Sequence, residues 1–225
     1  MSKVKQPGNE HGSLKDIQVL VNKNQDLIDN IIKKEFPEMI YENIYWKSPL
    51  EVDDFAEYRD NDFIDIIGLD HNEIKLQEYW PERGPQWDAL ATTSGSRIIL
   101  VEAKANIPEI VSPPSSAGPK SKAQVDQSLK ETKIALGIKN NVDWSGKFYQ
   151  FTNRLAHLYF LRELHKEPAY LINIYFIGDK SVSGPETIGE WKAALQVLYS
   201  YLGLKHHKLN KYMANIYIDV TLLKH

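Results

Sequence analysis

Three residues near the middle of the chain, Asp88, Glu102 and Lys104, have types that together could hydrolyse a phosphate ester. Side chains alternate between the two faces of a strand, so Glu102 and Lys104 point the same way and Ala103 points to the reverse face. Two carboxylates held close together repel unless a cation lies between them, and Mg²⁺ prefers such oxygen ligands. A bound metal lowers the pKa of its water, and a lysine can orient or deprotonate that water and neutralise developing charge. These residue types therefore indicate metal-dependent hydrolysis.

The register of one predicted hairpin decides whether these side chains meet. Two strand-like segments flank a turn centred on Gly95, and the second is apolar on both faces, which indicates a buried central strand. With Gly95 at the centre of a three-residue turn, Leu90 lies opposite Leu100 and Asp88 lies opposite Glu102. A register slip of two residues preserves this arrangement, whereas a slip of one residue moves Asp88 to the other face. The simplest register therefore gathers the acids and the lysine on one face.

These residues resemble the motif of the PD-(D/E)XK nuclease superfamily, which includes restriction endonucleases, repair nucleases and RecB-type exonuclease domains. The chain has Trp87-Asp88, thirteen intervening residues and then Glu102-Ala103-Lys104 after an apolar strand, with Trp87 where the motif names proline. The resemblance implies that Asp88, Glu102 and the Ala103 carbonyl bind Mg²⁺ or Mn²⁺ and that Lys104 is the catalytic lysine. It also implies a restriction-endonuclease-like αβββαβ core.

The first predicted helix carries an acid that the resemblance makes relevant. Ser13 followed by Asp16 resembles a capping box with a shorter acid, and Pro37 ends the helix. Glu35 lies four residues after Ile31 on the apolar face, so we expect it to face the core or a cleft. Many members of the superfamily carry an acid on this helix that points into the site, which implies that Glu35 binds the metal. The alternative is a frayed last turn with an exposed Glu35.

A helix predicted near 147–165 adds two polar candidates. Gln150 and Arg154 fall on one stripe, opposite a stripe of apolar residues. Gln150 is similar in spacing to the glutamine of the downstream Gln-x-x-x-Tyr motif in RecB-like members, which implies a place near the metals, although Arg154 stands where that motif has tyrosine. The Arg154 guanidinium would suit a phosphate oxygen. The alternative is an ordinary solvated helix face.

The remaining nucleic-acid contacts are predicted from charge and aromatic residues. Lys120 and Lys122 precede or begin a helix near 121–138, and we expect them to form a basic margin for a phosphate backbone, although scattered lysines are commonly just solvated. Trp80 and Trp87 could stack on bases, but burial in the core is the favoured interpretation.

The predicted fold class is α/β, with a mixed central sheet flanked by helices. Residues 1–13 form a flexible polar leader, residues 14–225 form a single domain, and a Pro/Ser-rich loop at 108–123 is mobile. The predicted elements, in chain order, are a helix over 14–36, strands over 41–46, 63–80, 87–93 and 97–104, helices over 121–138 and 147–165, a strand over 170–177, a helix over 187–202 and a strand over 215–223.

The composition limits the classes of protein that fit. The 225 residues include no cysteine, which excludes disulfides, thiolate metal sites and a catalytic thiol. Neither a secretory signal nor a membrane-spanning stretch is evident, so we expect a cytoplasmic protein. A net charge of −3 argues against coating nucleic acid through bulk charge but allows a local basic groove.

The sequence therefore predicts a Mg²⁺- or Mn²⁺-dependent nuclease whose partner is nucleic acid, DNA in preference to RNA. The resemblance also allows a homodimer, because dimers are common among members that cut both strands. Two alternatives stay open: a binding or interaction module of the same fold without cleavage activity, and an unrelated α/β protein in which Glu102 and Lys104 form a structural ion pair.

Overall fold

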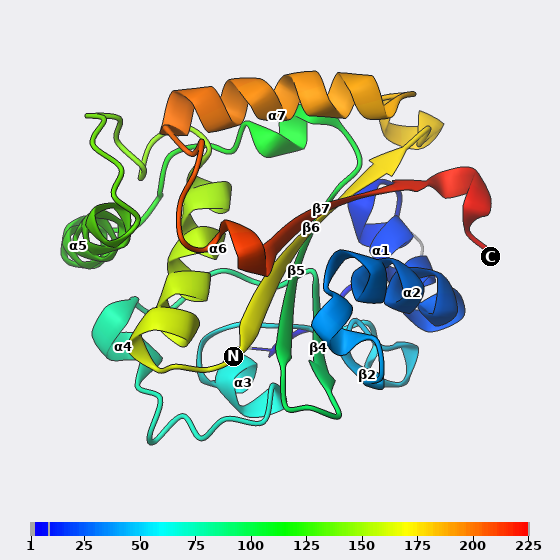
Figure 1. The fold of residues 1–225 in the computed structure, drawn as a ribbon, viewed down its shortest axis with the longest axis horizontal. Coiled ribbons are helices and arrows are strands. Elements are labelled where there is room, and N and C mark those ends of the chain that lie inside the picture. Colours follow the sequence, from blue (N-terminus) through cyan, green and yellow to red (C-terminus); the bar gives the residue numbers. More distant parts are fainter. Residues whose placement is uncertain (1–2, 9, 225) are drawn as a thin grey trace.

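The fold of the chain is a central five-stranded mixed sheet with helices on both faces, as the computed structural model shows for residues 3–8 and 10–224 (Figure 1). The spatial order of the strands is β2, β4, β5, β6, β7. The β2–β4 and β4–β5 pairs are antiparallel, and the β5–β6 and β6–β7 pairs are parallel. The strands span Ile44–Ser48 (β2), Ala89–Thr93 (β4), Ile98–Lys104 (β5), Ala169–Ile177 (β6) and Met213–Asp219 (β7). The predicted α/β class with a mixed sheet flanked by helices is therefore confirmed.

The two central strands are apolar because helices cover both of their faces. All nine residues of β6 are buried, and in β5 only Lys104 is partly exposed. Such strands appear in a sequence as continuous hydrophobic runs rather than as alternating ones. The burial of β5 places Glu102 and Lys104 at the end of a rigid strand in the middle of the sheet.

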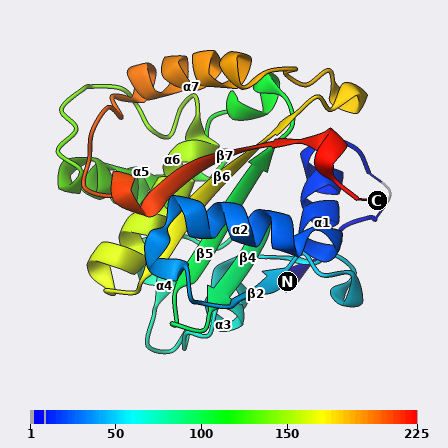
Figure 2. The same ribbon diagram turned by 45° about the vertical axis from the view of Figure 1, so that its right-hand side comes forward.

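Two short helices cover one face of the sheet, α1 (Ser13–Lys23) and α2 (Gln25–Glu35) (Figure 2). The sequence predicts one continuous helix here, and the structure divides it at Asn24. The Asn24 side chain donates from Nδ2 to the carbonyls of Val19 and Lys224, both at 3.1 Å, and its Oδ1 accepts from the Lys224 backbone N–H at 2.9 Å. The break therefore ties the first helical layer to residues that follow the last strand.

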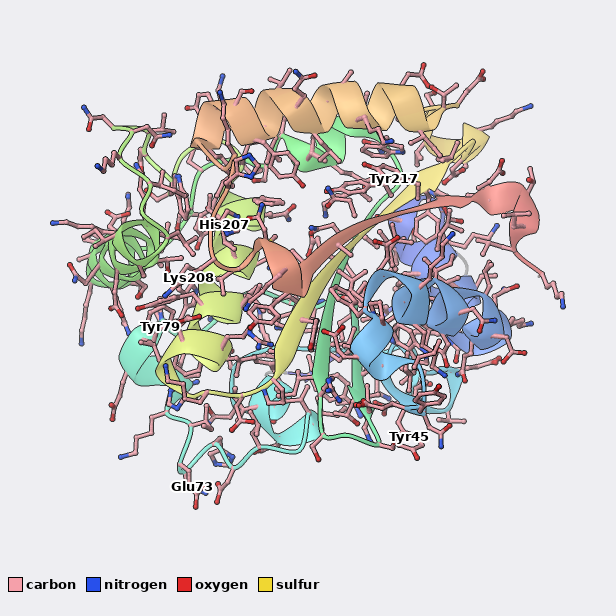
Figure 3. The ribbon with its side chains drawn as sticks, viewed as in Figure 1. Tyr45, Glu73, Tyr79, His207, Lys208 and Tyr217 are labelled. Carbon is pink, nitrogen blue, oxygen red and sulfur yellow. The ribbon has the colours of Figure 1, made fainter. Side chains whose placement is uncertain are left out.

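The other face is covered by a larger set of helices (Figure 1). These are α3 (Asp60–Ile66), α4 (Leu76–Tyr79), α5 (Pro119–Ala135), α6 (Tyr149–Tyr159), which continues as a π-helical turn over Phe160–Leu164, and α7 (Ile188–Leu202). The short helix α4 is anchored on α5, since the Tyr79 hydroxyl lies 2.7 Å from the Thr132 hydroxyl (Figure 3). Side chains fill the space between these helices and the sheet.

The strand predicted over 63–80 is wrong, because this segment forms α3 and α4 instead. Phe63, Ile64 and Ile67 are all at most 3% exposed, and their spacing of one, three and four residues brings them to one side of a helical turn. The isoleucines that favour a strand by composition are thus buried by a helix against the tertiary core.

A small two-stranded sheet lies outside the central one, formed by β1 (Lys3–Val4) and β3 (Glu57–Tyr58) in antiparallel pairing. Its first strand falls in the segment for which the sequence predicts a flexible leader. The Gln6 backbone N–H also donates to the Asp54 carbonyl at 3.2 Å. Within residues 3–8 and 10–224, no helix is both long and apolar enough to cross a membrane.

Candidate functional site

The hairpin of β4 and β5 has the register that the sequence predicts. Leu90 pairs with Leu100, and at the turn the Thr93 backbone N–H donates to the Arg97 carbonyl at 2.9 Å. Just before β4, Asp88 Oδ2 accepts a hydrogen bond of 2.6 Å from the Ala103 backbone N–H. Asp88 therefore lies beside Glu102 and Lys104 at the end of the buried strand, as the prediction requires.

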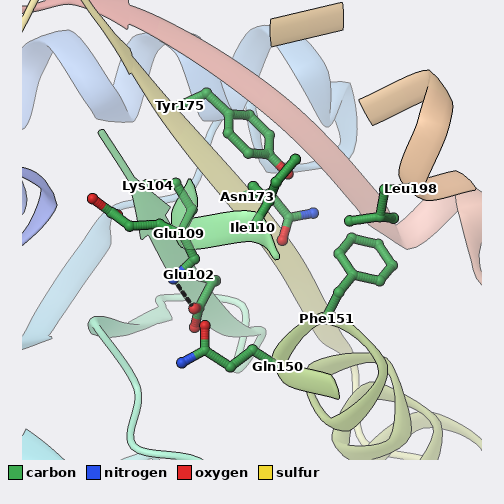
Figure 4. A pocket seen from close by; sticks show the side chains of 9 residues that line it. All are labelled: Glu102, Lys104, Glu109, Ile110, Gln150, Phe151, Asn173, Tyr175 and Leu198. Atoms are coloured by element: carbon green, nitrogen blue, oxygen red, sulfur yellow. Dashed lines mark hydrogen bonds and ion pairs between the residues drawn. The ribbon is translucent and has the colours of Figure 1, made fainter. Parts of the chain in front are cut away.

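Glu102 is held between two cations, Lys104, whose ion pair Figure 4 shows, and Arg154. One carboxylate oxygen pairs with Lys104 Nζ, and the other accepts from Arg154 Nε at 2.5 Å. The Glu102 residue is 6% exposed and Arg154 is 5% exposed, so the second pair is almost completely buried. A buried charge requires such partners, because an unpaired carboxylate would lose its hydration without compensation.

Arg154 lies on the buried face of α6 and not on a solvated one. Its Nη2 donates to the Gln86 carbonyl at 2.7 Å, and its Nη1 donates to Asn153 Oδ1 at 2.9 Å. Its guanidinium also lies 4.9 Å from the centre of the Trp87 ring. The interpretation of this stripe as an ordinary solvated face is wrong for Arg154, whereas Gln150 is exposed, and the described contacts of Arg154 stabilise the site from within. Trp87 itself is fully buried, as the core interpretation of this residue predicts.

Glu57, on β3, is an acidic residue of this site that the sequence does not single out. It is 5% exposed, and its Oε2 accepts from Gln86 Nε2 at 2.5 Å and from Gln6 Nε2 at 2.8 Å. Burial raises the pKa of Glu57, and the negative charge of Glu102 adds to this effect. Its segment, residues 53–62, is rich in acidic residues, and no local pattern in it indicates that this glutamate is buried.

The charges of the site set the protonation of its members. Burial, followed by the charge of Glu102, raises the pKa of Asp88 well above its usual range. Burial also opposes ionisation of Glu102, but the positive charges of Arg154 and Lys104 outweigh it and lower the pKa of Glu102. Burial disfavours the charged form of Lys104, yet Glu102 and Asp88 together raise its pKa. The ion pairs thus favour an ionised Glu102 and a protonated Lys104, while Asp88 holds a proton more readily than an ordinary aspartate.

These side chains open into a cavity of about 360 Å³. Its wall combines the charged cluster with the segments that precede β4 and follow β5. Its lining residues include Glu57, Arg83, Asp88, Glu102, Lys104, Ser116, Tyr149 and Arg154. A smaller pocket of about 20 Å³ lies on the other side of Glu102 and Lys104 (Figure 4). Gln150, an exposed residue of α6, lines both spaces, so the structure brings this predicted residue to the site.

The donor set is chemically suited to Mg²⁺ or Mn²⁺. Asp88 and Glu102 supply carboxylate oxygens, and Mg²⁺ commonly takes one or two carboxylates together with water and substrate phosphate oxygens. The Ala103 backbone N–H points to the Asp88 side of the hairpin. Because the carbonyl of a strand residue lies on the same strand edge as its N–H, the Ala103 carbonyl points to that side too. Among the described residues, however, no group of three or more histidine, aspartate or glutamate side chains is arranged to hold a metal ion. A metal would therefore be bound by two carboxylates and by the substrate, and Glu102 would have to release one of its ion pairs.

Three predicted site residues lie elsewhere. Glu35 is exposed at the end of α2, in the layer on the opposite face of the sheet, so the prediction that it points inward is wrong. Phe36, which directly follows the last turn of α2, packs in the core instead of Glu35. Lys120 is exposed on the first turn of α5, and Lys122 pairs with Asp126 at 2.8 Å and with the Ser145 hydroxyl at 2.9 Å. Neither lysine lines the cavity of about 360 Å³.

The chain was compared with protein-family models, with curated proteins and with solved structures, and no match was found in any of the three comparisons.

Proposed function

We propose that the protein is a metal-dependent nuclease that hydrolyses phosphodiester bonds in DNA at the Asp88–Glu102–Lys104 cluster. One observation carries the proposal: the hairpin register sets Asp88 beside Glu102, with Lys104 on the same strand end, in the wall of a cavity of about 360 Å³. The order of the elements supports a restriction-endonuclease-like core, since α2, β2, β4, β5, α6 and β6 occur in the chain order helix, three strands, helix and strand, with β3, α3 and α4 inserted before β4 and α5 inserted before α6.

Each residue has a distinct role in this proposal. The Asp88 and Glu102 carboxylates bind Mg²⁺ or Mn²⁺, together with the Ala103 carbonyl. The bound ion supplies Lewis acidity towards a phosphate oxygen and lowers the pKa of a water. Lys104 Nζ orients the attacking water and neutralises charge that develops on the phosphate. Gln150 and Arg154 lie at the same cavity, where Arg154 keeps Glu102 ionised and in place.

A second candidate function is a binding module of the same fold without cleavage activity. The observation that favours it is the occupation of both Glu102 oxygens, by Lys104 and by Arg154. If these two ion pairs persist in the presence of divalent metal, Glu102 has no oxygen to offer and the cluster is structural.

A cleavage assay distinguishes the two functions. The purified protein is incubated with single- and double-stranded DNA and with RNA, with Mg²⁺ or Mn²⁺, and metal binding is followed by calorimetry. We expect Asp88→Asn and Lys104→Met each to reduce the cleavage rate on the order of 10²-fold or more. Glu73→Gln, which removes an exposed carboxylate far from the cluster, serves as the control and should cleave normally. Cleavage that survives both cluster substitutions would refute the nuclease proposal, and absence of both cleavage and metal binding would favour the binding module.

A further inference from the structure

A second cavity adjoins the candidate site. It measures about 480 Å³, and Arg83, Ser116 and Tyr149 line both this cavity and the one that contains the acids. The two cavities adjoin, because they share three residues of their walls, and we call the two together the joined groove. It extends from Asp88 and Glu102 past Tyr149 to Trp80.

Arg83 is the cation of the joined groove that has no acidic partner. Lys104 and Arg154 are both paired with Glu102, whereas the ion pairs found among the described residues include none of Arg83. Arg83 is exposed and lines both cavities, so its charge lies where the two spaces meet. An exposed arginine in a groove is well suited to bind a phosphate, because its planar guanidinium can donate two parallel hydrogen bonds.

The backbone around Arg83 is fixed. Arg83 has a φ of 64°, a left-handed conformation that is uncommon for residues other than glycine. The Asp60 carboxylate, 9% exposed, accepts from the backbone N–H groups of Arg83 at 3.1 Å and of Gly84 at 2.9 Å. A buried aspartate thus holds this turn in place, which reduces the entropy that Arg83 would lose on binding a ligand.

The depth of the acids favours a single strand over a duplex. Glu57 and Glu102 are 5% and 6% exposed, so a phosphate must enter the cavity to reach them. The backbone of an unpaired strand can bend into such a space, whereas a duplex would have to be opened first. Tyr149, partly exposed and packed against Trp80 with ring centres 6.5 Å apart and planes 19° apart, gives the joined groove an aromatic wall of the type on which unpaired bases stack.

We propose that the joined groove binds one unpaired DNA strand and that Arg83 binds a backbone phosphate next to the one at the acids. The position of a phosphate at Asp88 and Glu102 rests on the proposed function, whereas the contact of Arg83 with the strand is measured independently of cleavage. Arg83 is then a substrate-binding residue, and the depth of the acids is what selects unpaired strands.

The test is a binding titration of the full chain with a fluorescently labelled 12-nucleotide single strand, followed by anisotropy at several salt concentrations. Ca²⁺ replaces Mg²⁺, because its larger and less regular coordination shell disfavours the octahedral arrangement of Mg²⁺, and the oligonucleotide is checked on a gel for cleavage. We expect Arg83→Ala to weaken binding about tenfold and to lower the slope of log K against log salt by roughly 0.7, the loss of one phosphate contact on a single strand. Arg83→Lys should keep most of the slope.

A matched control is Lys34→Ala, which removes one exposed positive charge from α2 on the opposite face of the sheet and should leave both quantities unchanged. Circular dichroism shows whether each variant is folded. Equal affinity and slope for wild type and Arg83→Ala would overturn the proposal, as would tighter binding of the corresponding duplex or no binding of the single strand by the wild type. If binding depends on Arg83 but the wild type cleaves nothing with Mg²⁺ or Mn²⁺, the nuclease proposal fails and the strand-binding proposal stands. If cleavage occurs and its rate is unchanged in Arg83→Ala, the strand-binding proposal fails and the nuclease proposal stands.

Discussion

Glu102 owes its ionised state to partners from two different elements, Lys104 on its own strand and Arg154 on α6. Without Arg154, the Glu102 residue, which is 6% exposed, would keep only one of its two cationic partners. We expect Arg154→Ala to lower the free energy of unfolding by about 3 kcal/mol, the usual cost of breaking a buried ion pair from one side. Urea denaturation measures this, with Lys130→Ala on the exposed side of α5 as a control expected to change stability little. A change for Arg154→Ala as small as that of the control would contradict the burial of this pair.

A second pair of acids lies outside the Asp88–Glu102–Lys104 cluster. Asp16 on α1 is 5% exposed, and Asp179, after β6, is 9% exposed. A side-chain hydrogen bond with Asp179 favours the protonated form of Asp16. The sequence predicts that Asp16 takes part in capping α1, and this prediction is wrong. No side chain caps this helix, and Asp16 is turned inward instead. Burial, together with the neighbouring Asp179, raises the pKa of Asp16 to about 7.

This raised pKa predicts a pH-dependent stability. The folded state keeps a proton on Asp16 that the unfolded state releases near 3.8. The stabilisation is therefore fully present below that pH and is lost as the pH rises through about 7, by up to roughly 4 kcal/mol. Asp16→Asn should flatten the decline between pH 4 and 8 in denaturation experiments, whereas Asp26→Asn, at an exposed position of α2, should keep it. An unchanged profile in Asp16→Asn would show that another group is responsible.

The sequence predicts those site residues that lie on one hairpin. Asp88, Glu102 and Lys104 are brought together by local register, so alternation and turn length suffice to place them. The partners Glu57 and Arg154 come from elements that are distant in the sequence, and no local pattern indicates that they meet Glu102. Glu35 was misplaced because helical periodicity gives the face of a residue but not whether the last turn still contacts the core.

Among the elements, α7 has the clearest local signals. Thr187 accepts from the Glu190 backbone N–H at 3.2 Å, and the Glu190 side chain accepts from the Thr187 backbone N–H at 2.8 Å, which is a reciprocal capping box. Thr187→Ala should lower the free energy of unfolding by about 1 kcal/mol. Ser200→Ala removes a hydroxyl from an exposed interior position of the same helix and should be neutral or slightly stabilising. Equal effects of the two substitutions in thermal or urea unfolding would mean that the cap contributes nothing.

Elements with strong local signals were predicted close to their observed bounds, and others were not. The predicted helix over 187–202 matches α7, which ends at Gly203 with a φ of 77°, and the strand over 170–177 matches β6. The segment over 63–80 has the composition of a strand, but tertiary packing of its isoleucines against the sheet forms two short helices. Likewise, the bonds of Asn24 to Lys224 that divide the first helix depend on residues at the far end of the sequence.

At the scale of the whole molecule, the sheet separates two hydrophobic cores that share the same central strands. Ile172 of β6 lies in the core beneath α1 and α2, and Leu171 next to it lies in the core beneath α5, α6 and α7. Since each of these strands contributes to both cores, neither core can be lost while the other persists. We therefore expect one cooperative unfolding transition.

The prediction is tested with Ile172→Ala, a substitution at a fully buried position. It should lower the free energy of unfolding by about 2–5 kcal/mol and shift the transitions seen by far-ultraviolet circular dichroism and by tryptophan fluorescence equally. Val197→Ala, at a side chain that is 64% exposed on α7, should change stability by less than about 0.5 kcal/mol. Two separate midpoints in the Ile172→Ala protein would show that the layers unfold independently.

The hydrogen bonds between Asn24 and Lys224 also have a consequence for biosynthesis. The helices α1 and α2 are translated before the strands β6 and β7 and before the Lys224 backbone that fixes the break at Asn24. Strands β2, β4 and β5 are translated in between and cover part of the apolar side chains of the two helices, and the part that β6 and β7 cover stays exposed until then. Exposed apolar surface on a nascent chain promotes aggregation. The native arrangement of this layer can therefore form only after Lys224 has been translated, and molecular chaperones that shield the apolar surface of α1 and α2 until then should assist the folding of this chain.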